Sequence, residues 1–147
     1  MDAITLLKQD HRKVDRLFEE IKTKQQVQDR ERLFNEIRTE LTVHATIEEK
    51  LFYPAVQNAR QTHEKILESY EEHKQVKMVL ADLAEADKST ENWMAGLTVL
   101  LEDVQHHVKE EEEDIFPKVR EKILSEQELD DLGARMQQMK EEQLATA

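Results

Sequence analysis

The stretch His106–Pro117 reads HHVKEEEEDIFP, with two histidines ahead of a run of acids and an apolar pair before the proline. A second stretch, His44–Pro54, reads HATIEEKLFYP and aligns with the first without a gap at an offset of 63 positions. The coincident pairs are His44 and His107, Glu48 and Glu111, Glu49 and Glu112, and Pro54 and Pro117. An acidic run alone is usually a solvated surface, whereas this repeated pattern of histidine, acid and proline indicates a shared structural unit.

Around both stretches apolar residues recur in steps of three and four, the spacing of a helix with one buried face. The spacing predicts helices over residues 3–24, 29–58, 62–86 and 90–121. The segment Ser125–Glu128 reads SEQE, which has the form of a capping box and predicts a fifth, amphipathic helix.

Only two glycines and two prolines occur, and 37% of the residues are charged, which favours long helices. We therefore expect an all-α fold: an up-down-up-down four-helix bundle over residues 1–122. Residues 123–147 are expected to form a C-terminal amphipathic helix and tail packed on the same domain.

Local signals place the helix boundaries and the buried faces. Ser89 or Thr90 is expected to cap the fourth helix. Both prolines lie late in their helices and are expected to kink or end them, because proline has no N–H to donate. The buried stripe of the second helix is expected to run through Leu33, Ile37, Leu41, His44, Glu48, Leu51 or Phe52, and Ala55.

Charge and composition exclude several classes of function. The net charge of −12 argues against binding a nucleic acid through its phosphates, which requires a basic surface. The chain has no cysteine, so disulfides are excluded and any metal must have nitrogen and oxygen ligands. Neither a signal peptide nor a membrane-spanning run is apparent, so we expect a soluble cytoplasmic protein.

Four of the six histidines fall on the stripes that should face the core, together with two glutamates four residues after a histidine. That spacing puts each histidine and glutamate pair on one face of a helix. Buried carboxylates require a compensating cation, so the joint pattern predicts a metal site with two equivalent halves. The predicted ligands are His11, His44, Glu48, His73, His107 and Glu111.

Further histidines and acids lie near the predicted ligands in the sequence. His106 and Glu110 have the same spacing as the predicted ligands, but His106 points about 100° away from the stripe, which predicts either a surface position or a position just behind the ligands. His63 is expected to be exposed. Glu49 and Glu112 repeat, and either a solvated position or a role in supporting the ligands is left open.

On these residues the chain resembles the hemerythrin-like, or HHE cation-binding, family over roughly residues 3–121. The resemblance implies a non-haem di-iron centre with two irons and an oxo or hydroxo bridge. It implies that Glu48 and Glu111 bridge the irons, that His11 and His44 bind one iron, and that His73 and His107 bind the other. The oxygen-carrying members have a further histidine where this chain has Lys77, so about two coordination positions on the irons would stay open.

The resemblance implies a protein that binds O₂ or another small diatomic or peroxide ligand, in sensing, redox protection or iron handling. Two alternatives stay open: an oxidase or peroxidase acting at the same site, and a helical bundle binding another divalent metal such as zinc or manganese. The C-terminal helix is expected to pack within the chain, and a weak homo-oligomer through it is left open.

Overall fold

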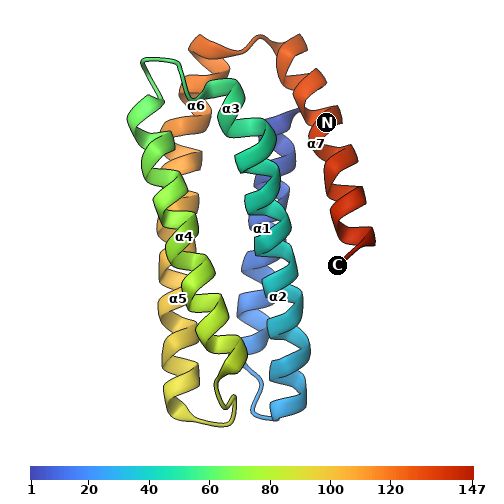
Figure 1. The fold of residues 1–147 in the computed structure, drawn as a ribbon, viewed down its shortest axis with the longest axis vertical. Coiled ribbons are helices and arrows are strands. Elements are labelled where there is room, and N and C mark those ends of the chain that lie inside the picture. The colour runs from blue at the N-terminus through green and yellow to red at the C-terminus, as the bar shows by residue number, and fades with distance from the viewer.

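A computed structural model describes all 147 residues, and they form an all-helical bundle with its long helices side by side (Figure 1). The first two long helices are α1 (Ala3–Lys22) and α2 (Val27–Ile47), and α2 continues through η1 (Glu48–Phe52) into α3 (Tyr53–Val56). The second pair is α4 (His63–Glu85) and α5 (Glu91–Glu110); α5 continues through η2 (Glu111–Ile115), α6 (Phe116–Lys118) and η3 (Val119–Ile123). The chain ends in α7 (Glu126–Ala145). The expected four-helix bundle with an additional C-terminal helix is confirmed.

Side chains cap three of these helices at their N-termini, where the backbone leaves N–H groups without partners. The Asp2 carboxylate accepts from the Thr5 N–H at the start of α1. Of the two expected caps for α5, Thr90 is the one used, and its hydroxyl accepts from the Trp93 N–H at 3.1 Å. Ser125 and Glu128 form the complete capping box that the sequence predicts for α7.

The helix that contains Pro54 ends soon after it, at Val56, whereas the helix that contains Pro117 continues to Ile123, so ending the helix is wrong for Pro117. A five-residue π-helical turn lies just before each proline, over Glu48–Phe52 and over Glu111–Ile115. In each turn the hydrogen bond spans five residues, from the Tyr53 N–H to the Glu48 carbonyl and from the Phe116 N–H to the Glu111 carbonyl. The wider turn accommodates the proline, which would otherwise clash with the preceding α-helical turn.

The π turn also moves the buried face of the helix by one residue. Past Glu48 the sequence stripe predicts Ala55 in the core, but Ala55 is exposed and Val56 is buried instead. The second half of the chain shows the same shift, because Val119 is buried at the position equivalent to Val56. A stripe counted at 3.6 residues per turn cannot predict the extra residue.

The apolar core consists of two separate clusters. One, at the end of the bundle that carries α3 and α6, includes Leu7, Ile47 and Phe52. The other, toward the α1–α2 and α4–α5 connections, includes Val14, Ile37 and Trp93. His11 lies between Leu7 and Val14 along α1, so a layer of buried polar side chains separates the two clusters. None of the helices combines the length with the apolar composition that a membrane span requires.

Helix α7 lies against α1 and α2 on the outside of the bundle, with the N-terminus of the chain beside it (Figure 1). Its buried residues Leu129, Leu132 and Met136 join the first apolar cluster. Gly133 lies directly over the start of α1: a Cβ on it would come within 2.8 Å of the backbone of Asp2 and Ala3. Only glycine permits this approach of the two backbones.

We predict that Gly133→Ala destabilises the protein by about 1 to 3 kcal/mol, the usual cost of overpacking. In an exposed helix the same change would stabilise by up to about 1 kcal/mol. Gly96→Ala is the matched control, because the added methyl group meets only the flexible end of Leu83. Urea unfolding of the two variants measures the difference, and a Gly133→Ala protein as stable as the wild type would contradict this packing.

Candidate metal centre

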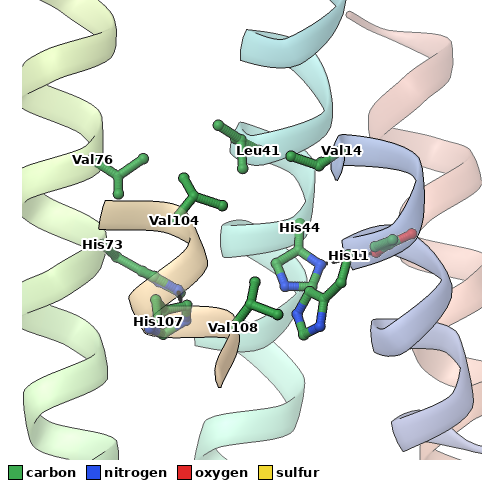
Figure 2. A pocket seen from close by; sticks show the side chains of 10 residues that line it. His11, Val14, Leu41, His44, His73, Val76, Val104, His107 and Val108 are labelled. Carbon is green, nitrogen blue, oxygen red and sulfur yellow. Dashed lines mark hydrogen bonds and ion pairs between the residues drawn. The ribbon is translucent and has the colours of Figure 1, made fainter. Parts of the chain in front are cut away.

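Six predicted residues meet in the polar layer. His11 lies on α1, His44 on α2, His73 on α4 and His107 on α5, and all four imidazoles are buried. Glu48 and Glu111 are the first residues of the two π turns, and both are 0% exposed. In Figure 2 the ring of His73 lies next to that of His107, and the ring of His11 lies next to that of His44.

The donor atoms form two groups of three, each with its atoms within 4.8 Å of one another: His11, His44 and Glu111, and His73, His107 and Glu48. The Oε1 atom of Glu48 lies 3.2 Å from the Nε2 of His44 and 3.1 Å from the Nε2 of His73. The Oε1 atom of Glu111 lies 3.2 Å from the Nε2 of His11 and 3.5 Å from the Nε2 of His107. Each carboxylate therefore lies between the groups, in reach of both.

Two buried atoms of this layer make no well-aligned hydrogen bond: the Oε2 of Glu48, and the Nε2 of His44, which has only the ion-pair contact of 3.2 Å with the Oε1 of Glu48. An unpaired buried polar atom is costly, and native structures rarely contain one. Here both atoms belong to the predicted ligand set, and imidazole nitrogen with carboxylate oxygen is a donor set that divalent transition metals accept. The residues present therefore fit a pair of cations.

Each imidazole is fixed from behind by a second carboxylate on its Nδ1 atom. Glu112 lies 2.6 Å from the Nδ1 of His11, and Asp10 lies 3.0 Å from that of His44. In the other half Glu49 lies 3.0 Å from the Nδ1 of His73, and Glu72 lies 2.7 Å from that of His107. Such a carboxylate fixes the ring orientation and leaves Nε2 free to bind a metal.

Two of these four carboxylates were missed by the sequence analysis. Glu49 and Glu112 repeat at the 63-residue offset, and a supporting role was left open for them. Asp10 and Glu72 were not considered, although each is the acid immediately before a predicted histidine ligand. That repeated acid-histidine pair was the signal available in the sequence.

Tyr53 is a further residue that sequence reasoning missed. Its hydroxyl donates toward the Oε2 of Glu111 at 2.9 Å and the Oε1 of Glu48 at 3.1 Å. Burial and then the two carboxylates raise the pKa of this hydroxyl well above its usual range, so it stays a donor. In the repeat its counterpart is Phe116, which stacks on His11 with ring centroids 6.0 Å apart. The two halves of the site therefore differ here.

The other two histidines, His63 and His106, belong to neither of the two groups of donor atoms. His63 is exposed and bonds to the backbone carbonyl of Gln57. The His106 side chain is 65% exposed, and with Glu72 and Glu110 it forms a group on the outer surface. Lys77 points outward and pairs with Glu49 at 3.6 Å.

A small cavity of about 40 Å³ opens from the four imidazoles toward the second apolar cluster (Figure 2). Its apolar lining residues are Val14, Leu41, Val76, Val104 and Val108. A volume of this size holds a few atoms, because the centre of one water molecule needs roughly 10 to 15 Å³ of free space. A typical organic ligand site is several hundred Å³.

Charge pairing governs the protonation of the site without metal. Burial acts to lower the pKa of His44, but Glu48 and the Asp10 hydrogen bond outweigh it and raise that pKa to about 10. Burial acts to raise the pKa of Glu48, but His44 holds it well below its usual range. His107 shows the same balance: burial is outweighed by Glu111, and its pKa rises. Protons on these imidazoles therefore occupy the place of a metal charge.

Comparison with known proteins agrees with this geometry. The family described as "Hemerythrin HHE cation binding domain" matches residues 2–119. A crystal structure of an HHE domain-containing protein, the Rv2633c homolog from Mycobacterium kansasii, superposes with a TM-score of 0.88 at 27% identity and covers 99% of this chain and 89% of that one.

A curated relative from Nostoc sp., named DNA nickase, is 29% identical over 127 residues. The match covers 86% of this chain but only 36% of that relative, so the chain spans about a third of its length.

For the metal-free protein we predict maximal stability between about pH 4.5 and 6.5. The folded state binds the His44 proton more tightly than the unfolded state, so this contribution is complete below about pH 6.5 and is lost as the pH rises toward about 10. The Glu48 contribution has the opposite sign and is lost as the pH falls below about 4.5. Thermal unfolding of chelator-treated protein, from below pH 4.5 up to about pH 10, measures both losses of stability.

The exposed histidine gives the control: His63→Gln should leave the profile unchanged. A metal-free protein equally stable at pH 6.5 and pH 9.5 would contradict the buried charge pairing.

Proposed function

The chain belongs to the hemerythrin HHE cation-binding domain family, and we propose that its buried layer holds two iron ions as a non-haem di-iron centre that binds O₂ or a related small oxidant. The observation that carries the proposal is the composition of the two groups, each with two imidazoles and one carboxylate. Two histidines and one carboxylate with open positions are the ligand set typical of non-haem Fe(II) sites. Iron in such a site supplies an open coordination position and electrons for a bound oxidant.

The chain's own residues limit which molecule can reach the centre. The cavity beside the imidazoles has about 40 Å³ and an apolar lining of valines and leucine. This volume fits a diatomic molecule or a peroxide and excludes larger organic substrates. The apolar lining keeps bulk water away from the four Nε2 atoms, while Tyr53 holds a hydroxyl donor between the carboxylates. Sensing, redox protection and iron handling are all compatible with such a site.

An oxidase or peroxidase is the enzymatic alternative, because hydrogen peroxide also fits the cavity. Turnover of hydrogen peroxide by the iron-loaded protein, compared with the chelated protein, separates this alternative from simple binding. A bundle that holds zinc or manganese is the third candidate, since imidazole and carboxylate accept those ions too.

We predict that protein purified anaerobically with iron contains about two irons per chain and changes its visible spectrum on exposure to air. His107→Ala removes one of the two imidazoles of its group and should lower the content to about one iron. His63→Ala is the control at an exposed histidine that contacts none of the site residues, and it should keep both irons. Elemental analysis gives the count. Wild-type protein with zinc or no metal, and no spectral change in air, would refute the di-iron proposal.

Acid should release the metal. Ligating imidazoles must be deprotonated, and His44 and His107 hold protons firmly when no metal is present. We therefore predict that the metal content per chain falls between pH 8 and pH 5 when samples are dialysed against a weak chelator. A flat metal content over this range would argue against imidazole ligation.

A further inference from the structure

Behind each of the four carboxylates that orient a histidine lies a cationic side chain or a further imidazole. Arg12 lies 2.7 Å from Glu112, and Lys77 lies 3.6 Å from Glu49. Lys140 lies 2.5 Å from Asp10, while His106 faces Glu72 at 3.6 Å. The site is thus built outward in layers, from the inner Nε2 atoms through the imidazoles and carboxylates to these groups.

Lys140 differs from the other three because it comes from α7. The others lie on α1, α4 and α5, which are helices of the bundle, whereas Lys140 lies beyond residues 2–119 that match the family. It joins the Oδ1 of Asp10, and the Oδ2 of Asp10 bonds to the Nδ1 of His44. One uninterrupted chain of contacts therefore leads from the C-terminal helix to a predicted metal ligand.

The carboxylate that Lys140 contacts is also the most buried of the four. The Asp10 side chain is 4% exposed, compared with 18% for Glu112, 23% for Glu72 and 27% for Glu49. Water can compensate the charge of the other three in part, but it has little access to Asp10.

The helix α7 holds Lys140 in place through its own packing. Gly133 brings α7 against the start of α1, and Leu129, Leu132 and Met136 are buried against the bundle. Met139, the residue before Lys140, packs against the same cluster. The Lys140 side chain is only 20% exposed, so it is a fixed partner of Asp10.

We propose that Lys140 is a positioning residue through which α7 supports one half of the metal centre, the half that contains His11 and His44. Lys140 fixes the Asp10 carboxylate, and Asp10 fixes the ring of His44 with its Nε2 toward the metal. Without Lys140, the buried Asp10 carboxylate loses its cationic partner and turns toward water, which releases the His44 ring. The inference rests on the proposed function, because it concerns the same two metal positions.

The chain offers a matched control in Lys13. Its ammonium group lies 2.7 Å from the buried carboxylate of Glu40, across α1 and α2. This ion pair resembles that of Lys140 and Asp10 in type and burial of the acid, but Glu40 contacts none of the four histidines. Lys13→Met therefore reports the effect of losing such an ion pair on the fold alone.

The experiment is an anaerobic Fe²⁺ titration of the full chain, in competition with a chelator, for wild type, Lys140→Met, Lys140→Arg and Lys13→Met. We expect Lys140→Met to weaken the binding of one of the two irons by about tenfold. This is the lower end of the loss of metal affinity that follows when a residue supporting a metal ligand is changed. The other iron should bind as in wild type. Lys140→Arg keeps the positive charge and should bind both irons as wild type does. Lys13→Met should also bind both irons with wild-type affinity. In Mössbauer spectra of the iron-loaded proteins, the signal of one of the two irons should change in Lys140→Met, and neither signal should change in Lys13→Met.

Three results would overturn the inference: Lys140→Met binds both irons as tightly as wild type, Lys140→Met weakens the binding of both irons equally, or Lys13→Met weakens iron binding to the same extent. If Lys140→Met fails to fold, Lys140→Gln gives the comparison with Lys140→Arg, and equal binding by these two variants would also overturn it. Wild-type protein that binds no iron would refute the proposed function itself. The two failures are therefore distinguishable.

Discussion

The structure depends on one constraint, the presence of two completely buried carboxylates between two apolar clusters. Glu48 and Glu111 have no access to water, and each lies within 3.5 Å of imidazoles from two groups. Two negative charges so close together in a dry interior are strongly unfavourable unless cations compensate them. Protons on His44 and His107 provide that compensation in the absence of metal, and a pair of metal ions provides it within the proposed centre. The imidazole that holds a proton and the imidazole that binds a metal are the same group, so folding and metal binding share one set of charges.

The π turns show how the backbone meets this constraint. The turns η1 and η2 each begin at a buried glutamate and end just before a proline, at the same place in both halves of the chain. Past the glutamate, the buried side chains are Phe52 and Tyr53 in one half and Ile115 and Phe116 in the other. The proline and the glutamate are thus parts of one local solution, which explains why they recur together in the sequence.

Sequence periodicity predicted what depends on helical phase. The histidines and glutamates of the stripe, the outward direction of His106, the capping box at Ser125 and the five helices follow from steps of three and four residues. The π turns did not follow, because the period itself changes there, and this misplaced Ala55 in the predicted core. Asp10 and Glu72 were missed for a different reason: their contacts cross between helices, and a stripe drawn on one helix carries no information about its neighbours. Tyr53 could be compared with Phe116 in the repeat, but only the fold shows that its hydroxyl reaches both carboxylates.

The repeat makes the two halves similar, and the exceptions to it make them unequal. Tyr53 places a hydroxyl donor between the carboxylates where the other half has the phenyl ring of Phe116 on His11. Behind His44 stands Asp10, held by a lysine from α7, whereas behind His107 stands Glu72, which faces an exposed imidazole. Both differences act at the level of the four imidazoles, beside a cavity too small for anything but a few atoms. The imidazoles and carboxylates of the proposed centre therefore have near-twofold symmetry, whereas the residues behind them do not. A small molecule that enters the cavity meets two metal positions with the same ligands but with different charged and polar groups behind those ligands.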